Sequence, residues 1–267
     1  MKLSIVKGKL GVIIFTLIAL NTLSLSSAEA SYKAIVIKKP ISSTMRILSI
    51  GDSITEGMVD MTHKVWYGNY ANEMNLSLIA QGYRPVFLGT VAPPRKYLNP
   101  ETYPKPVNTE GHGGYCLAAN YHNCLVNPMN PKAKNSILDN INIYLGNVTP
   151  DLVILQGGVN DLNSINTHKM KVLPSVSMLK LVDITHKKYP NSKIIILSIF
   201  STHPELKNEI SHYNSYMENT FQKSSFIKFL PLKKLSNPTL LDKDGIHPNN
   251  KGYKQISKDI MKAVTTW

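Results

Sequence analysis

Hydrophobic positions along the chain follow two alternating patterns. Short apolar runs, typical of strands buried on both faces of a parallel sheet, occur near 45–50, 85–90, 151–156, 193–200 and 226–230. Between them, apolar residues recur at helical spacing in longer segments, at about 65–80, 133–146, 172–189, 205–222 and 250–265. Strands that alternate with helices predict a parallel sheet with helices packed on both faces.

The predicted fold class is therefore α/β. We expect a three-layer α/β/α sandwich with a doubly wound, mainly parallel, five-stranded sheet of the flavodoxin-like kind. No internal repeat or second domain is evident, so we assign 45–267 to one domain that follows a lead-in segment at 31–44. Ligands of such sheets bind beyond the carboxyl ends of the strands. The loops that follow 50, 90, 156, 199 and 230 are therefore where we expect chemistry.

The first 30 residues have the pattern of a secretory signal peptide. Lys2, Lys7 and Lys9 precede the apolar run LGVIIFTLIAL, and Ala28 and Ala30 fit the small-x-small rule for cleavage. A transmembrane anchor is the alternative, but the apolar run is short for a bilayer. We predict cleavage after Ala30, a secreted or periplasmic protein, and no stable membrane anchor afterwards.

Charge changes this picture little. The chain has 30 Lys and Arg against 17 Asp and Glu, a net charge of +13. Basic surfaces attract nucleic acid, anionic lipid or anionic polysaccharide. The lysines are scattered rather than clustered in sequence, so we expect a generally basic surface and no nucleic-acid partner.

The two cysteines, Cys116 and Cys124, lie close together in sequence. In an exported protein such a pair is most simply a disulfide. Free thiols are one alternative. The other is a zinc site that adds His112 and His122, although this spacing matches no common zinc module. We predict the disulfide and no metal.

Ser53 stands at a place where chemistry is expected, directly after the first strand in RILSIGDSITEGMV (46–59). The nucleophile elbow of α/β-hydrolases would need glycine two residues after the serine, and Thr55 occupies that position. That fold is therefore disfavoured. Ser53 alone is explained equally well as a helix cap or as a nucleophile.

A second cluster near the end of the chain supports the nucleophile. In DKDGIHPNNKGY (242–253), Asp244 and His247 share a tight turn with Gly245 and Pro248. A histidine that deprotonates a serine needs a carboxylate on its other ring nitrogen, and Asp244 can supply it. Asp242 is a second candidate for this role, and a surface turn that only caps the last helix is the non-catalytic alternative.

Two further loops offer hydrogen-bond donors for a developing oxyanion. QGGVNDL (156–162) contains the side-chain amide of Asn160, and TEGHGGY (109–115) contains Gly114, whose backbone N–H no side chain shields. Each loop alone is ordinary, since Asn-Asp and Gly-Gly often just form turns.

These four blocks, in this order and strand context, resemble the signature of the SGNH (GDSL-type) hydrolases from about 45 to 253. The resemblance implies a serine ester hydrolase without a cofactor. It implies Ser53 as nucleophile, His247 as base and Asp244 as the residue that orients it. The backbone N–H of Ser53, together with Gly114 and Asn160, would form the oxyanion hole.

A finer resemblance concerns the carbohydrate esterase branch. GYRPVFLGT (82–90), an insert, and EGHGGYCL (110–117) are similar to family three acetyl xylan esterases, where the glycine block usually reads GHSGW. Here Gly113 replaces the serine and Tyr115 replaces the tryptophan. These differences keep the oxyanion glycine and leave the substrate open.

We therefore expect a monomeric, secreted esterase that removes acyl groups, above all acetyl, from a carbohydrate. The alternatives are a lipase, lysophospholipase or thioesterase, and a glycan-binding protein with an inactive site. The histidines outside the blocks, His203 among them, are assigned to surface or capping positions. Candidates for substrate binding are Asp52, His112, Tyr97, Tyr103 and Tyr115.

Overall fold

The computed structural model describes residues 43–60, 65–66, 68–92, 106–118, 135–163 and 173–266. The predicted signal peptide (1–30) and the lead-in segment up to residue 42 lie outside them, so the assignments made there stay predictions. Residues Thr44–Trp267 form one unit. Among the described residues, no helix combines the length and the apolar character needed to cross a membrane.

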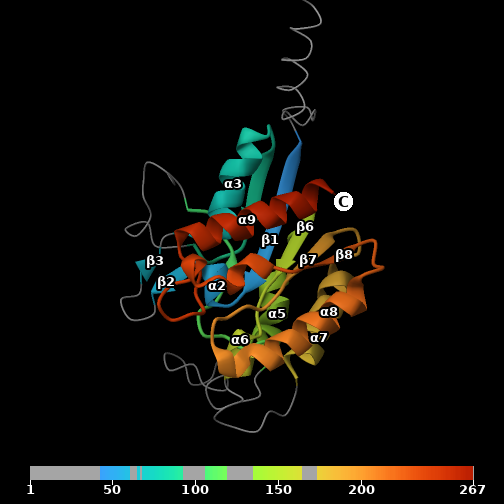
Figure 1. The fold of residues 1–267 in the computed structure, drawn as a ribbon. Coiled ribbons are helices and arrows are strands. Elements are labelled where there is room, and N and C mark those ends of the chain that lie inside the picture. The colour runs from blue at the N-terminus through green and yellow to red at the C-terminus, as the bar shows by residue number, and fades with distance from the viewer. Residues whose placement is uncertain are drawn as a thin grey trace, which may run out of the picture. The chain divides into compact units, whose positions relative to one another are not determined.

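A parallel sheet organises this unit (Figure 1). Its long strands are β1 (Thr44–Gly51), β4 (Arg84–Leu88), β6 (Leu152–Leu155), β7 (Lys193–Leu197) and β8 (Ile227–Leu230), in the spatial order β4-β1-β6-β7-β8. In chain order, the first strand therefore lies between the second and the third. This is the flavodoxin-like order, and its switch point lies between β1 and β6. The predicted fold class is confirmed.

The central strands are buried because helices cover both faces of the sheet. All four residues of β6 are buried, as are the last five residues of β1. Ile47 pairs with Leu152, and Ile194 pairs with Ile227. Continuous runs of Ile, Leu and Val suit this environment, since both sides of each strand face apolar side chains.

The sheet has six strands rather than the predicted five. β5 (Glu110–Gly111) pairs in parallel with Ile50 and Gly51 at the carboxyl end of β1. Two residues are too few to produce a hydrophobic pattern, so periodicity could not reveal this strand. Its effect is to bring the glycine block beside the point where β1 ends.

Helices form the two outer layers. α3 (Tyr70–Ala80) and α9 (Asn250–Thr265) lie on one face of the sheet, and α5 (Ile137–Leu145), α7 (Pro174–Lys188) and α8 (Lys207–Phe221) lie on the other (Figure 1). α3 begins at Tyr70 rather than at 65, because the Asn69 side chain caps it by accepting from Asn72 N–H. Residues Val65–Trp66 instead form strand β3, which pairs antiparallel with β2 (Met58–Asp60).

Short helices follow the carboxyl ends of the strands and escaped the sequence analysis. α2 (Ser53–Glu56) follows β1 and α6 (Val159–Asn163) follows β6. After β7 comes the 3₁₀ helix η2 (Pro204–Leu206), and after β8 come η3 (Lys233–Ser236) and η4 (Pro238–Leu240). One-turn helices carry too few residues for a helical period. Two of them nevertheless hold candidate site residues, since α2 begins with Ser53 and α6 contains Asn160.

Candidate active site

Ser53 lies where β1 ends and α2 begins. Asp52 has extended backbone (φ −92°, ψ −151°), and its Oδ1 accepts a 3.0 Å hydrogen bond from Ile54 N–H. Asp52 therefore caps the helix, and Ser53 does not. Gly57 ends α2 after one turn in the left-handed conformation, with φ of +100°. Ser53 itself is 3% exposed.

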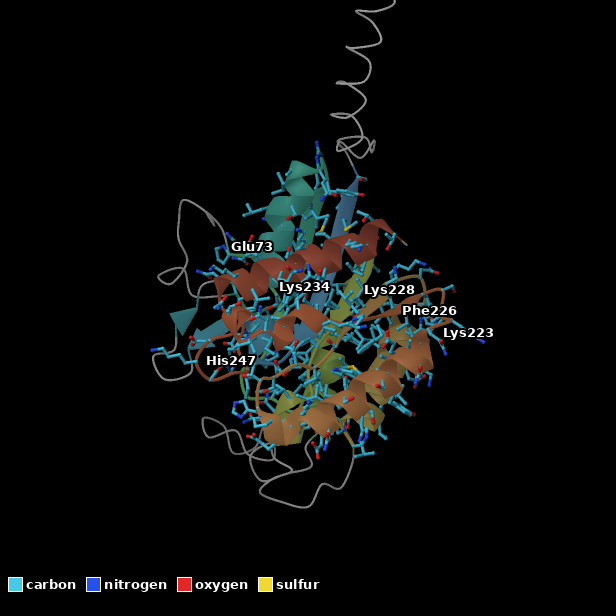
Figure 2. All side chains as sticks on the ribbon, in the orientation of Figure 1. Glu73, Lys223, Phe226, Lys228, Lys234 and His247 are labelled. Atoms are coloured by element: carbon cyan, nitrogen blue, oxygen red, sulfur yellow. The ribbon has the colours of Figure 1, made fainter. Side chains whose placement is uncertain are left out.

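The Ser53 hydroxyl meets a histidine from the far end of the chain. Ser53 Oγ lies 2.8 Å from His247 Nε2, and His247 Nδ1 lies 2.5 Å from Asp244 Oδ2. His247 stands just before α9 (Figure 2). With its proton on Nδ1, the ring donates to Asp244 and presents Nε2 to accept from the serine. The structure thus brings together a hydroxyl, an imidazole and a carboxylate in the order that activates a serine.

Backbone hydrogen bonds fix the Asp244 carboxylate. Its Oδ1 accepts from the N–H groups of Ile246 and His247, both at 3.0 Å. Burial raises the pKa of Asp244, but hydrogen bonds from His247 and from the two backbone N–H groups outweigh it, so the pKa lies below its ordinary value. Asp242, the second sequence candidate, closes the turn instead, because its N–H donates to the His247 carbonyl at 2.7 Å.

A hydrogen bond joins the loop that carries Asn160 to the loop that carries Gly114. Asn160 Nδ2 donates to the Tyr115 carbonyl at 2.9 Å. Gly114 belongs to a turn that Tyr115 N–H closes on the His112 carbonyl at 3.2 Å, and its φ of +77° requires glycine. The turn follows β5 and Asn160 follows β6, and both strands pair with β1. Both loops therefore leave the sheet at the edge where Ser53 lies.

His112 is held within the protein. Its Nε2 lies 3.1 Å from Glu110 Oε2, and its ring stacks on Tyr144 with centroids 4.4 Å apart. Tyr115 also packs against this ring, with centroids 5.0 Å apart. These contacts favour a structural role for His112 over direct recognition of a substrate.

Buried polar side chains that the sequence analysis did not single out connect the loops around Ser53. Gln156 Oε1 accepts from Thr55 Oγ1 at 3.1 Å and from Asp52 N–H at 3.3 Å. Asp161 Oδ2 accepts from Leu117 N–H at 2.9 Å. These residues bind the loops after β1 and β6 and the glycine block to one another. Their types are common in loops, so no sequence signal marks them.

Two buried carboxyl groups in these loops have raised pKa values. Burial raises the pKa of Asp52 to about 6, against the opposing effect of the hydrogen bond from Ile54. Burial likewise raises the pKa of Asp161 to about 7, opposed by the hydrogen bond from Leu117 N–H. Asp52 was a candidate for substrate binding, but it is fully buried. Its role as the cap of α2 favours a structural function beside Ser53.

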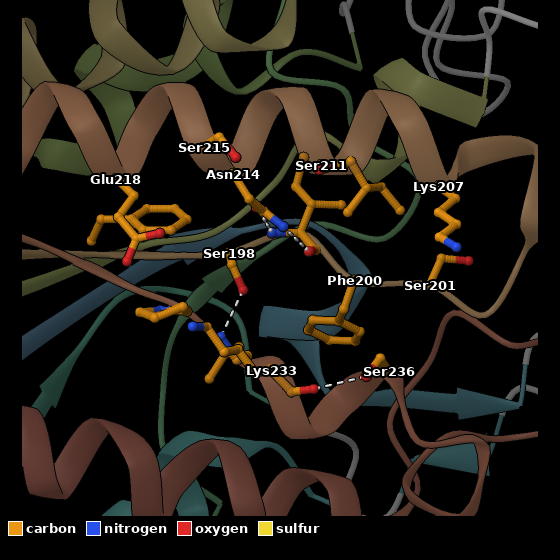
Figure 3. Close-up of a pocket in the computed structure, with 15 residues that line it drawn as sticks. Ser198, Phe200, Ser201, Lys207, Ser211, Asn214, Ser215, Glu218, Lys233 and Ser236 are labelled. Carbon is orange, nitrogen blue, oxygen red and sulfur yellow. Dashed lines mark hydrogen bonds between the residues drawn. The ribbon is translucent and has the colours of Figure 1, made fainter.

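Two cavities flank the edge strand β8. One of about 490 Å³ lies between α8 and η3 and contains Phe200, Ser201 and Lys207 (Figure 3). The other, of about 510 Å³, lies between β8 and α9. Neither is lined by Ser53 or His247. Their cationic lining residues are Lys207 and Lys233 in the first, and Lys228, Lys233, Lys234 and Lys262 in the second.

The remaining sequence candidates are tested only in part. Tyr97, Tyr103, His122 and Cys124 lie outside the described residues. Cys116 is buried, and no cysteine among the described residues is free. The disulfide with Cys124 therefore stays a prediction. Within the described ranges, no group of three or more acidic, histidine or cysteine side chains is arranged to hold a metal ion.

This chain is similar in sequence and fold to several known proteins. The model of the GDSL-like lipase/acylhydrolase family matches residues 49–255. A multidomain esterase of Ruminococcus flavefaciens is 25% identical over 83% of this chain, which spans 28% of that protein's length. Among solved structures, a family 3 carbohydrate esterase of Clostridium thermocellum shares 24% identity, with a TM-score of 0.60 over 82% of this chain and 94% of the other. One from Talaromyces cellulolyticus shares 18%, with a TM-score of 0.56 over 83% and 97%.

Proposed function

We propose that this chain, which belongs to the GDSL-like lipase/acylhydrolase family and is an ester hydrolase, removes acetyl groups from a carbohydrate by means of Ser53, His247 and Asp244. One observation carries the proposal above all others. It is the line of hydrogen bonds from Ser53 Oγ through His247 to Asp244, at the carboxyl edge of the sheet.

In the proposed reaction, Ser53 Oγ attacks the ester carbonyl carbon while His247 Nε2 takes the hydroxyl proton. Asp244 accepts from His247 Nδ1 and stabilises the imidazolium that forms. When the tetrahedral intermediate collapses, the C–O bond to the sugar breaks and His247 gives its proton to the departing alcohol. A water molecule, deprotonated by the same nitrogen, then hydrolyses the acyl-enzyme and restores Ser53.

The negative charge of the intermediate needs donors close to the carbonyl oxygen. We assign them to the backbone N–H of Ser53, the backbone N–H of Gly114 and the side-chain amide of Asn160. Ser53 is the first residue of α2, where an N–H has no partner within the helix. The bond to the Tyr115 carbonyl orients the Asn160 amide before substrate arrives, which is the preorganisation that makes such donors effective.

Two observations support acetyl esters of a carbohydrate. Two of the solved structures that this chain resembles are family 3 carbohydrate esterases. The insert at 91–108 is rich in proline and tyrosine and has few aliphatic residues. Tyrosine offers a flat apolar face with a polar tip, which suits sugar rings better than a long acyl chain.

The lysine-lined cavities support an acidic polymer as the carrier of the acetyl groups. The first cavity is lined by residues that directly follow β7 and β8, at the same edge of the sheet as Ser53. The two cavities share Lys233, and only Glu218 and Asp259 add negative charge to their linings. Carboxylate groups of a polysaccharide that crosses this edge would meet complementary charge.

Export is part of the proposal and rests on residues 1–30 alone. The protein recovered after export should begin at Ser31, and its mass should show one disulfide, between Cys116 and Cys124. An intact mass that retains the first 30 residues would contradict cleavage, and two free thiols would contradict the bridge.

Ser53→Ala tests the central assignment. The variant should fold as the wild type does, lose nearly all esterase activity, and fail to react with a fluorophosphonate probe that labels the wild type. Equal labelling of both proteins would contradict Ser53 as nucleophile.

The acyl preference is tested with p-nitrophenyl acetate, butyrate, octanoate and palmitate, and with acetate release from acetylated glycans. A long-chain lipase gains about 0.8 kcal/mol for each methylene it buries, so its kcat/KM would rise with chain length. We expect the highest kcat/KM for acetate. A preference for octanoate or palmitate, with no acetylated glycan accepted, would replace the carbohydrate esterase by a lipase.

A further inference from the structure

The loop that follows β7 forms hydrogen bonds with the turn that carries Asp244 and His247. The Gly245 carbonyl accepts from Thr202 N–H at 2.8 Å and from Ser201 Oγ at 3.1 Å. The Asp244 carbonyl lies 2.6 Å from His203 Nε2. The backbone of the turn is therefore fixed by donors from residues 201–203.

His203 differs from the other donors because both of its ring nitrogens face acceptors. Nε2 faces the Asp244 carbonyl, and Nδ1 lies 2.9 Å from Glu205 Oε1. A carbonyl oxygen and a carboxylate oxygen can only accept, and a neutral imidazole has a single N–H. Only the doubly protonated ring can make both hydrogen bonds at once.

The surroundings favour this charged form. The bond to the Asp244 carbonyl, then the bond to Glu205, hold the pKa of His203 above its ordinary value, against a smaller opposing effect of burial. The charged groups that act on it are Glu205, from η2, and the Asp244 carboxylate, from the facing turn. The His203 side chain is 36% exposed, so it can exchange its proton with solvent.

We propose that His203 is a positioning residue: in its doubly protonated form it bridges Glu205 and the Asp244 carbonyl and so holds the Asp244 carboxylate in place for His247. This inference rests on the proposed roles of Ser53, His247 and Asp244. It adds a second, partly exposed histidine whose charge state controls how firmly His247 is oriented.

Loss of one proton from His203 breaks the bridge. If the remaining proton is on Nδ1, two lone pairs meet at the Asp244 carbonyl. If it is on Nε2, the ring loses the Glu205 contact that fixes its orientation. Either tautomer weakens the hold on the turn. We therefore expect kcat to fall about three- to tenfold on the alkaline side of the pH profile, as the loss of one hydrogen bond would cause, with KM unchanged.

Three variants test the inference with p-nitrophenyl acetate as substrate. His203→Gln replaces the ring by a neutral amide that donates at every pH, so its kcat should lack the alkaline fall. Glu205→Gln should move that fall to lower pH, because it removes the carboxylate that favours the charged ring. His203→Ala should lower kcat across the whole range. His212→Gln, at an exposed position on α8, is the matched control and should follow the wild type.

A readout independent of activity comes from the His203 ring signals in an NMR titration. The pKa of His203 should lie above that of an unstructured peptide and should fall in Glu205→Gln. Reduced thermal stability in His203→Ala with an unchanged kcat and pH profile would show a merely structural role and overturn the inference. Activity that survives Ser53→Ala would instead overturn the proposed function, whatever the His203 variants do.

Discussion

At the scale of single residues, Asn160 is the donor whose removal separates catalysis from binding. Asn160→Ala should lower kcat by about 10²–10³-fold, the usual cost of one oxyanion donor, with a smaller change in KM. The variant also loses the bond to the Tyr115 carbonyl, so Asn160→Asp, which keeps the shape of the side chain, is the companion variant. A change confined to KM in both would mean that Asn160 only binds substrate.

Asp52 gives the site a dependence on pH that can be measured as stability. The folded protein keeps the Asp52 proton up to about pH 6, whereas the unfolded chain releases it near the ordinary value of 3.8. Between these values the folded state binds more protons, so the free energy of unfolding falls as pH rises. From this group alone, the loss above pH 6 is roughly 3 kcal/mol.

Asp52→Asn removes this titration while its Oδ1 can still accept from Ile54 N–H. The wild type minus variant difference in the free energy of unfolding, from urea titrations at about pH 4 and about pH 8, should decrease by roughly 2–3 kcal/mol between the two. Asp183→Asn, which removes an exposed carboxylate on α7, controls for the change of charge. A difference that is constant with pH would contradict a raised pKa at Asp52.

Residues of the site divide into those the sequence revealed and those it hid. Ser53, Asp244, His247, Gly114 and Asn160 stand in blocks whose types and order point to one chemistry. The structure joins the first three by hydrogen bonds, and the roles of Gly114 and Asn160 stay predictions. Gln156, Asp161 and His203 were hidden, because their significance depends on which distant backbone groups they meet. His203 bonds to a carbonyl 41 residues away, and no local pattern encodes that contact.

At the scale of elements, the two-residue strand β5 is in direct backbone contact with α2, the helix that begins with Ser53. A Cβ at Gly111 would overlap the backbone of Glu56, so β5 and α2 touch main chain to main chain. This contact sets the distance between the glycine block and the helix that begins with Ser53. Long strands and helices were predictable from hydrophobic period. β5, α2 and α6 were not, because elements of two to five residues are too short for a hydrophobic period to repeat.

Gly111→Ala tests this contact. The added methyl group should push α2 away from β5, lower the free energy of unfolding by about 1–3 kcal/mol, and reduce kcat because Ser53 moves with α2. Gly146→Ala is the control: it is strained by its φ of +50° and costs about 1–2 kcal/mol, but it lies after α5, away from Ser53. Wild-type kcat in folded Gly111→Ala would show that β5 does not position the nucleophile.

At the scale of the whole molecule, the net charge of +13 does not reveal where the lysines lie on the folded protein. Scattered lysines in sequence predicted only a basic surface. The fold gathers five of them around two cavities, because η3, α8 and α9 lie next to the edge strand β8. In Figure 2, Lys228 and Lys234 lie near β8 and α9, and His247 lies in the turn before α9. If these lysines hold the substrate, their removal must affect an acidic polymer and spare a small neutral ester.

The combined variant Lys207→Gln, Lys233→Gln, Lys234→Gln should raise KM for an acetylated, uronate-bearing glycan about three- to tenfold at low salt, because it removes three charges from the cavities. Its kcat/KM for p-nitrophenyl acetate should not change. The difference should vanish at about 1 M salt, where the Debye length is about 3 Å.

The control is a second triple variant, Lys180→Gln, Lys188→Gln, Lys223→Gln. It removes the same charge from α7 and from the segment after α8, outside both cavity linings. An equal rise in KM for both triple variants would mean that net charge alone attracts the polymer, and no rise in either would remove the acidic glycan from the proposal.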